Sequence, residues 1–79
     1  MRLDKYLKVS RLIKRRSIAN EACDHDRVLV NGKAARASYA VKVGDRITIQ
    51  LGARVTTVEV QSIVEHAPKD MASAMYREL

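Results

Sequence analysis

The 79-residue sequence has a single cysteine, a single proline and neither tryptophan nor phenylalanine. The lone Cys23 excludes an internal disulfide and fits a reducing compartment, because short secreted domains usually contain several disulfides. Since three tyrosines are the only aromatic residues, the core has to be built mainly from aliphatic side chains. A chain of this length forms one domain with a modest core.

The sequence also lacks the patterns of a membrane protein, an enzyme and a metal site. No apolar run approaches the roughly 18 residues of a membrane span, and Asp4 with several cations occupies the place of a signal peptide's apolar segment. There is no glycine-rich phosphate loop, serine elbow or carboxylate pair at a useful spacing. His25 and His66 are isolated, and Cys23 on an apolar stripe suits a buried core position. We therefore expect a cytoplasmic, non-enzymatic protein without metal or cofactor.

The excess of positive over negative charge is confined to the first fifth of the chain. Residues 1–16 contain seven cations and one anion, whereas residues 17–79 contain eight of each, so the formal net charge of +6 lies in the N-terminal block. Lys14, Arg15 and Arg16 stand side by side although like charges repel. A block of one sign beside a neutral remainder predicts a surface that binds a polyanion.

Two short helices are expected in and after this block. Residues 2 to about 9 place apolar side chains on one helical face and cations on the other, and Ser10–Lys14 is expected to form a turn. A second helix begins near Arg15 to Ser17, and its first turn carries the cationic triplet beside unpaired backbone N–H groups. Its expected apolar stripe consists of Ile18, Ala19, Ala22 and Cys23. The tip of this helix is therefore the part expected to meet a polyanion.

After Asp26 the apolar period changes to two, which indicates strands. Asn31-Gly32 is a strong hairpin signal, and Gly52-Ala53 suits a type II′ turn. The expected strands are Arg27–Val30, Lys33–Ala35, Arg46–Leu51 and Arg54–Val64. Together they predict a small antiparallel sheet.

The C-terminal part is expected to add a short helix. Pro68 interrupts the chain, and Asp70 can then cap a helix that carries Met71, Ala74 and Met75. The predicted class is α+β, with two N-terminal helices packed on a small antiparallel sheet. We expect residues 1–64 to form the main domain and residues 65–79 a short helical tail.

Four segments in order resemble the S-four RNA-binding domain, also called the alpha-L motif. They are RLDKYL (2–7), KRRSIA (14–19), VLVNGK (28–33) and VKVGDRI (41–47). Each is weak alone, but four in register are a specific signal, and the resemblance spans about residues 1–60. It implies two helices set against a small curved sheet and binding of structured RNA by the helical face.

The opening MRLDKYLKVSRLIKRR is most similar to the RqcP group, also called YabO, which is related to heat-shock protein fifteen. The resemblance implies a factor that binds the large ribosomal subunit, contacts 23S ribosomal RNA and peptidyl-tRNA, and works with RqcH in C-terminal alanine tailing. The chain departs from this family at Asp26, where glycine is usual, and we expect aspartate to adopt the left-handed conformation at a modest cost. It also lacks the long basic C-terminal extension of the heat-shock relatives.

Arg15 and Arg16 are the first candidates for phosphate contact, because guanidinium groups bind phosphate bidentately and stack on bases. The full predicted set is Arg2, Lys5, Lys8, Arg11, Lys14, Arg15, Arg16, Lys33, Arg36 and Tyr39. Two assignments stay open. Tyr39 either stacks on a base or packs in the core, and Asp4 either favours the helix start or holds a neighbouring arginine, Arg2 or Arg16.

Two other functions use the same cations. A membrane-surface module would press the first helix on anionic lipid, but its apolar face is small and is needed in the core. An accessory subunit or regulator of an RNA-modifying enzyme would bind RNA only with a protein partner. We expect a monomer.

Overall fold

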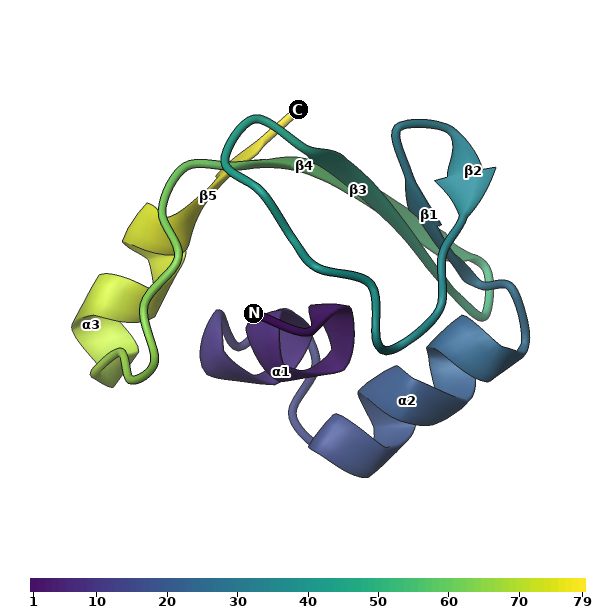
Figure 1. Ribbon diagram of the computed structural model, residues 1–79, viewed down its shortest axis with the longest axis horizontal. Helices are drawn as coiled ribbons and strands as arrows, with labels where there is room; N and C mark the ends of the chain where they lie inside the picture. Colours follow the sequence, from purple (N-terminus) through teal and green to yellow (C-terminus); the bar gives the residue numbers. More distant parts are fainter.

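The computed structural model describes residues 1–79, and the chain forms two layers in which two helices lie against one face of a curved sheet (Figure 1). The strands lie in the order β2-β1-β3-β4-β5, and all neighbours are antiparallel. They span β1 Val28–Val30, β2 Lys33–Ala34, β3 Arg46–Leu51, β4 Arg54–Val60 and β5 Tyr76–Glu78. The predicted α+β class, with a helical pair on a small antiparallel sheet, is confirmed.

Two-residue turns join the paired strands as the sequence predicts. Asn31 and Gly32 have φ values of 53° and 84°, and a type I′ turn requires positive φ at both positions. Gly52 has a φ of 60° in the β3–β4 turn, which suits the first position of a type II′ turn. Asp26 takes a φ of 55°, so this aspartate adopts the left-handed conformation expected before β1.

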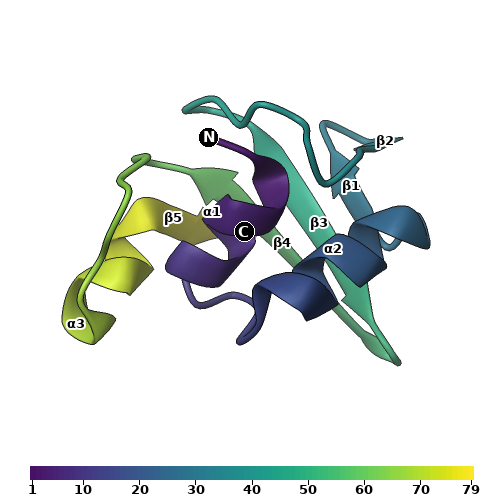
Figure 2. The same cartoon turned by 60° about the horizontal axis from the view of Figure 1, so that its bottom comes forward.

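Helices α1 (Leu3–Val9) and α2 (Arg16–Asp24) lie next to each other on the inner side of the sheet, and Figure 2 shows them from the helical side. The start of α1 is tied to the long connection between β2 and β3. Arg2 forms an antiparallel bridge with Ala40, and the Leu3 N–H donates to the Tyr39 carbonyl at 2.8 Å. This anchorage fixes the position of the first cation of the chain.

The core is one cluster of sixteen buried residues, almost all aliphatic, between the helices and the sheet. Tyr6 is its largest fully buried side chain, and its hydroxyl donates to the Met75 carbonyl at 2.7 Å. Met75 closes a short 3-10 turn (Ser73–Met75) that follows α3 (Lys69–Ala72) and leads directly into β5. The hydrogen bond therefore joins α1 to the C-terminal segment.

The first two strands are each one residue shorter than predicted, and three further local predictions differ from the structure. Ile18 is 44% exposed, because its position on α2 is at the edge of the apolar stripe beside the β3–β4 turn. β4 ends at Val60, four residues before the predicted Val64, and the chain then leaves the sheet. Pro68, not Asp70, occupies the N-cap position of α3, and no side chain caps that helix.

The fifth strand was not predicted. β5 has three residues, which is too short to show a period, and it forms because β4 offers it an open edge. The C-terminal segment therefore contains both the short helix expected there and a strand that continues the sheet.

Candidate nucleic-acid interface

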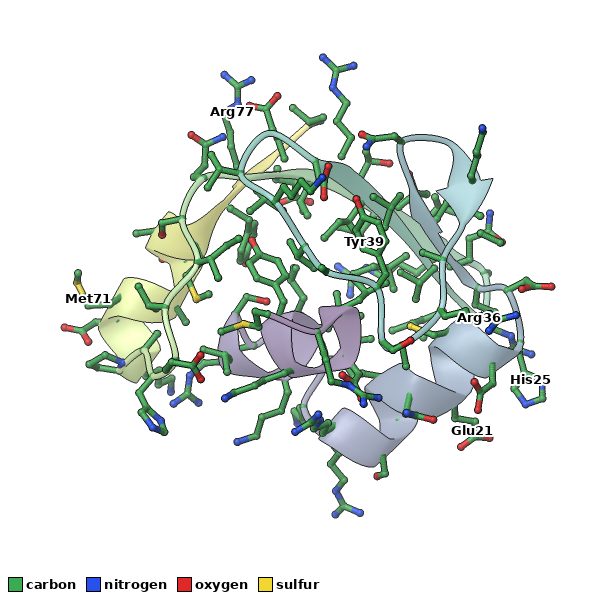
Figure 3. All side chains as sticks on the ribbon, in the orientation of Figure 1. Glu21, His25, Arg36, Tyr39, Met71 and Arg77 are labelled. Atoms are coloured by element: carbon green, nitrogen blue, oxygen red, sulfur yellow. The ribbon has the colours of Figure 1, made fainter.

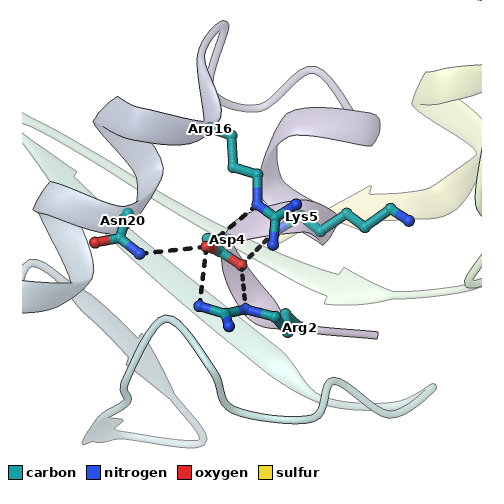
Figure 4. Close-up of polar contacts among 5 residues, drawn as sticks. All are labelled: Arg2, Asp4, Lys5, Arg16 and Asn20. Carbon is teal, nitrogen blue, oxygen red and sulfur yellow. Dashed lines mark hydrogen bonds and ion pairs between the residues drawn. The ribbon is translucent and has the colours of Figure 1, made fainter.

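A buried carboxylate holds two arginines where α1 meets α2 (Figure 4). The side chain of Asp4 is 3% exposed, whereas those of Arg2 and Arg16 are 50% and 48% exposed. Arg2 Nε donates to Asp4 Oδ1 at 3.2 Å, and Arg16 Nε lies 3.3 Å from Asp4 Oδ2. Both interpretations of Asp4 are therefore realised, because it lies in the first turn of α1 and holds both arginines.

Two further donors complete the surroundings of Asp4. Asn20 Nδ2 donates to Oδ2 at 3.3 Å, and the Lys5 backbone N–H donates to Oδ1 at 2.8 Å. Burial would raise the pKa of Asp4, but the hydrogen bonds from Arg2, Asn20, Arg16 and this N–H outweigh burial and lower the pKa. We call Arg2, Asp4, Arg16 and Asn20 the Asp4 cluster.

Asn20 was not predicted to belong to this site. It lies four residues after Arg16, so the two side chains share one face of α2. That spacing was the available signal, but it becomes informative only once α1 is known to pack on this face.

The other N-terminal cations are either paired or free. Lys5 Nζ forms an ion pair with Glu65 from the connection between β4 and α3, sixty residues away in the chain. The hydrogen bond from Lys5 lowers the pKa of Glu65. Four exposed cations have no carboxylate oxygen within 4.0 Å, namely Lys8, Arg11, Lys14 and Arg15. The unpaired cations of residues 1–16 therefore lie at the C-terminal end of α1 and in the turn between α1 and α2.

Three of the predicted RNA-contacting residues, which we call the second strip, lie beside the β1–β2 hairpin. Lys33, Arg36 and Tyr39 line a hollow of about 600 Å³ there. Arg36 also lines an adjoining hollow together with Arg2 and Asn20. Figure 3 shows Arg36 near the C-terminal end of α2. The structure thus connects the strip with the Asp4 cluster through Arg36.

A buried carboxylate, Asp45, holds Tyr39 of this second strip. Asp45 accepts hydrogen bonds from the Tyr39 hydroxyl at 2.9 Å, from Asn31 Nδ2 at 3.1 Å and from the Lys42 N–H at 2.9 Å. Burial would raise the pKa of Asp45, but these donors outweigh burial and lower the pKa. Half-buried Tyr39 packs on the core and also lines the hollow, so the structure shows its core packing and leaves base stacking as a prediction.

Comparison with known proteins places the chain in a family. The S4 domain family model matches residues 1–47, from the N-terminus into the start of β3. The chain is 50% identical over 76 residues to the RQC P-site tRNA stabilizing factor of Halalkalibacterium halodurans, covering 96% of this chain and 86% of that protein. The protein of the same name from Bacillus subtilis is 49% identical over 76 residues, with 96% and 88% covered. The chain belongs to the S4-domain family, among the RQC P-site tRNA stabilizing factors.

The S4-domain relatives extend to heat shock protein 15. The Escherichia coli protein is 33% identical over 79 residues, which cover 99% of this chain and 59% of that protein. The trimeric structure of Vibrio cholerae heat shock protein 15 matches this S4-domain chain with a TM-score of 0.93 at 32% identity, over 100% of this chain and 81% of that one. The predicted relationship to the RqcP group and to heat-shock protein fifteen is confirmed.

Other features of this S4-domain chain bear on the remaining expectations. No helix has the length and apolarity required to cross a bilayer. No group of three or more His, Cys, Asp or Glu side chains is placed to hold a metal ion. Cys23 is buried in the core as predicted, and burial, aided by the charges of Asp4 and Asp24, raises its pKa to about 11.

Proposed function

We propose that this chain is a non-enzymatic RNA-binding factor that docks on the large ribosomal subunit and steadies peptidyl-tRNA during rescue of stalled ribosomes. In this proposal it acts as a monomer in the cytoplasm, contacts 23S ribosomal RNA and tRNA, and supports C-terminal alanine tailing with RqcH. Relatives named RQC P-site tRNA stabilizing factors support the ribosomal part. The observation that carries RNA binding is the arginine pair held by Asp4 on the helical face.

The geometry of this pair suits a phosphate backbone. Arg16 directs Nε at Asp4, and Arg2 contacts Asp4 through Nε and Nη2, so that the other terminal guanidinium N–H groups remain for an anion outside. Ordering a long side chain on binding costs roughly 0.5–1.5 kcal/mol, and Asp4 reduces that cost by ordering both beforehand. Guanidinium planes also stack on unpaired bases, which structured RNA presents and regular duplex does not.

The remaining cations extend the surface on both sides of the Asp4 cluster. Free cations at the end of α1 and on the α1–α2 turn supply charge, and the strip at the β1–β2 hairpin continues the path through Arg36. We propose the following RNA-contacting residues: Arg2, Lys5, Lys8, Arg11, Lys14, Arg15, Arg16, Lys33, Arg36 and Tyr39.

The test is co-sedimentation with purified large ribosomal subunits over a range of salt concentrations. With ~4 to 6 phosphate contacts, log K against log salt should fall with a slope of roughly −3 to −5. Arg16→Ala should weaken binding at least five- to eightfold at 0.1 M salt, which is roughly the contribution of one phosphate contact to the affinity. Arg27→Ala, an exposed arginine beyond the other end of α2, is the matched control and should bind like wild type.

A salt-independent affinity, or equal losses in the two variants, would contradict this function. Binding that appears only with a second protein present would favour the accessory-subunit hypothesis instead. The link to RqcH is tested separately, by asking whether alanine tailing on reconstituted stalled subunits slows when Arg16→Ala replaces wild type.

A further inference from the structure

Another basic feature, separate from the Asp4 cluster and from the second strip, lies between the α1–α2 turn and residues 65–68. It is a hollow of about 460 Å³, within the roughly 300–1,000 Å³ typical of small-ligand sites, and we call it the basic hollow. It is lined by Lys8, Val9, Arg11, Lys14, Glu65, His66, Ala67 and Pro68. Its second wall, residues 65–68, lies outside the residues matched by the S4 domain.

The backbone of the first wall is shaped to present cations. Arg11 has a φ of 63° at the position after the C-cap of α1, where glycine is the usual residue. Its N–H donates to the Lys8 carbonyl at 3.0 Å, and the Ile13 N–H returns to the Leu7 carbonyl at 3.1 Å. The turn thereby buries Ile13 in the core while Arg11 stays exposed on the hollow. An arginine accepts an unfavourable conformation here although glycine would fit better.

The second wall is held in place by the rest of the fold. Lys5 on α1 pairs with Glu65, and Ala67 packs against the core. Glu65 is the only acid in the lining, and Lys5 already engages it. None of Lys8, Arg11 and Lys14 has a carboxylate within 4.0 Å, so their charge remains uncompensated.

We infer that the basic hollow binds a phosphodiester segment of the RNA, as a contact site separate from the Asp4 cluster. Three cations on one wall match the repeated charge of a sugar-phosphate backbone. Val9 and Ala67 offer too little apolar surface for an acyl chain or a peptide anchor. The inference rests on the proposed RNA-binding function and adds the 65–68 segment to the interface.

The first variant, Arg11→Gly, removes the guanidinium group and places glycine at a position whose backbone has a positive φ. Binding to purified large subunits at 0.1 M salt should weaken roughly five- to eightfold, and the salt slope should become shallower by about 0.7–0.9. The thermal midpoint should stay equal or rise, because glycine favours a φ of 63°. A loss of affinity in a protein at least as stable as wild type is not a folding defect.

The second variant, His66→Glu, tests the other wall by placing an acid opposite the three cations. Its matched control is His25→Glu, the same substitution at an exposed histidine that lies away from the basic hollow. We expect His66→Glu to weaken subunit binding at least fivefold, and His25→Glu to remain within about twofold of wild type.

The outcomes separate this inference from the proposed function. If wild type fails to bind large subunits, the proposed function fails. If wild type binds and Arg16→Ala weakens it while Arg11→Gly and His66→Glu bind like wild type, the basic hollow is not an RNA site and the function stands. Equal losses from His66→Glu and His25→Glu also overturn the inference, since net charge alone would explain them. The inference is also overturned if Arg11→Gly weakens binding to phosphatidylserine vesicles but not to large subunits.

Discussion

Replacing Asp4 with asparagine separates two explanations of the basic surface that predict opposite signs. If charge alone governs RNA affinity, Asp4→Asn raises the net charge by one and should tighten binding up to roughly five- to eightfold at 0.1 M salt. If Asp4 acts by positioning Arg2 and Arg16, the same substitution should weaken binding despite the added charge.

The structure indicates that positioning dominates. Asparagine keeps the shape of the side chain but brings an NH₂ group toward the donors of Arg2, Arg16 and Asn20. Two freed arginines must be reordered on binding, at roughly 0.5–1.5 kcal/mol each, or about 1–3 kcal/mol together. This corresponds to a loss of roughly 5- to 140-fold. Because both arginines are half exposed, the expected loss of folding stability is about 1–2 kcal/mol, at the lower end for charged hydrogen bonds.

The measurement is the dissociation constant for purified large subunits, well below the unfolding midpoint of each variant. Asp24→Asn is the matched control, because Asp24 is an exposed acid on α2 that forms no ion pair and its loss changes the net charge equally. Asp4→Asn should bind at least fivefold more weakly than Asp24→Asn. Equal or tighter binding by folded Asp4→Asn would refute the positioning role.

Three further predictions concern the fold. The stability that ionised Asp4 and Asp45 contribute is complete above the ordinary carboxyl pKa of 3.8 and is lost as pH falls through their lowered folded-state pKa values. Urea unfolding from pH 6 to pH 2 should therefore show a decline that begins near pH 4, and a flat profile would contradict it. Tyr6→Phe removes one of three donors to the Met75 carbonyl, since the Gln61 and Ser62 N–H groups also donate to it, and should cost about 0.5–1.5 kcal/mol in urea unfolding, with faster hydrogen exchange in β5; unchanged exchange would argue against the contact. Cys23, with a pKa raised from 9.0 to about 11, holds ~100-fold less thiolate than an ordinary thiol, so a thiol reagent should modify it at least that much more slowly than in the unfolded chain.

The parts of the fold that depend on local pattern were predictable from sequence. The strand Arg46–Leu51 was predicted residue for residue, because its alternation is strict and turns bound it on both sides. Asn31-Gly32 specified its hairpin because few residue pairs tolerate two positive φ angles. β5 was not predictable, since its three residues acquire their structure only from the edge of β4.

The candidate site was only partly predictable for the same reason. The sequence placed seven cations in one block, but the pairing among them depends on how α1 packs on α2 and where residues 65–68 run. Asn20 joins Asp4 from the next helix, and Glu65 reaches Lys5 across sixty residues of chain. Neither contact has a local signal, and both decide which cations remain free.

The division of the N-terminal cations into paired and free ones predicts the salt dependence of RNA binding more closely than their total number does. Arg2 and Arg16 share Asp4 and leave a net charge of one, and Lys5 with Glu65 leaves none. The four free cations at the end of α1 and in the α1–α2 turn therefore supply most of the charge, and the block acts as about five charges, for a slope of roughly −3.5 to −4.5 if all contact phosphate. A steeper slope would mean that Lys33 and Arg36 also contact phosphate. In that case the slope should return to this range in a Lys33→Gln, Arg36→Gln double variant. A slope that stays steeper in that variant would show that Asp4 and Glu65 leave their cations electrostatically free, contrary to the pairing in the structure.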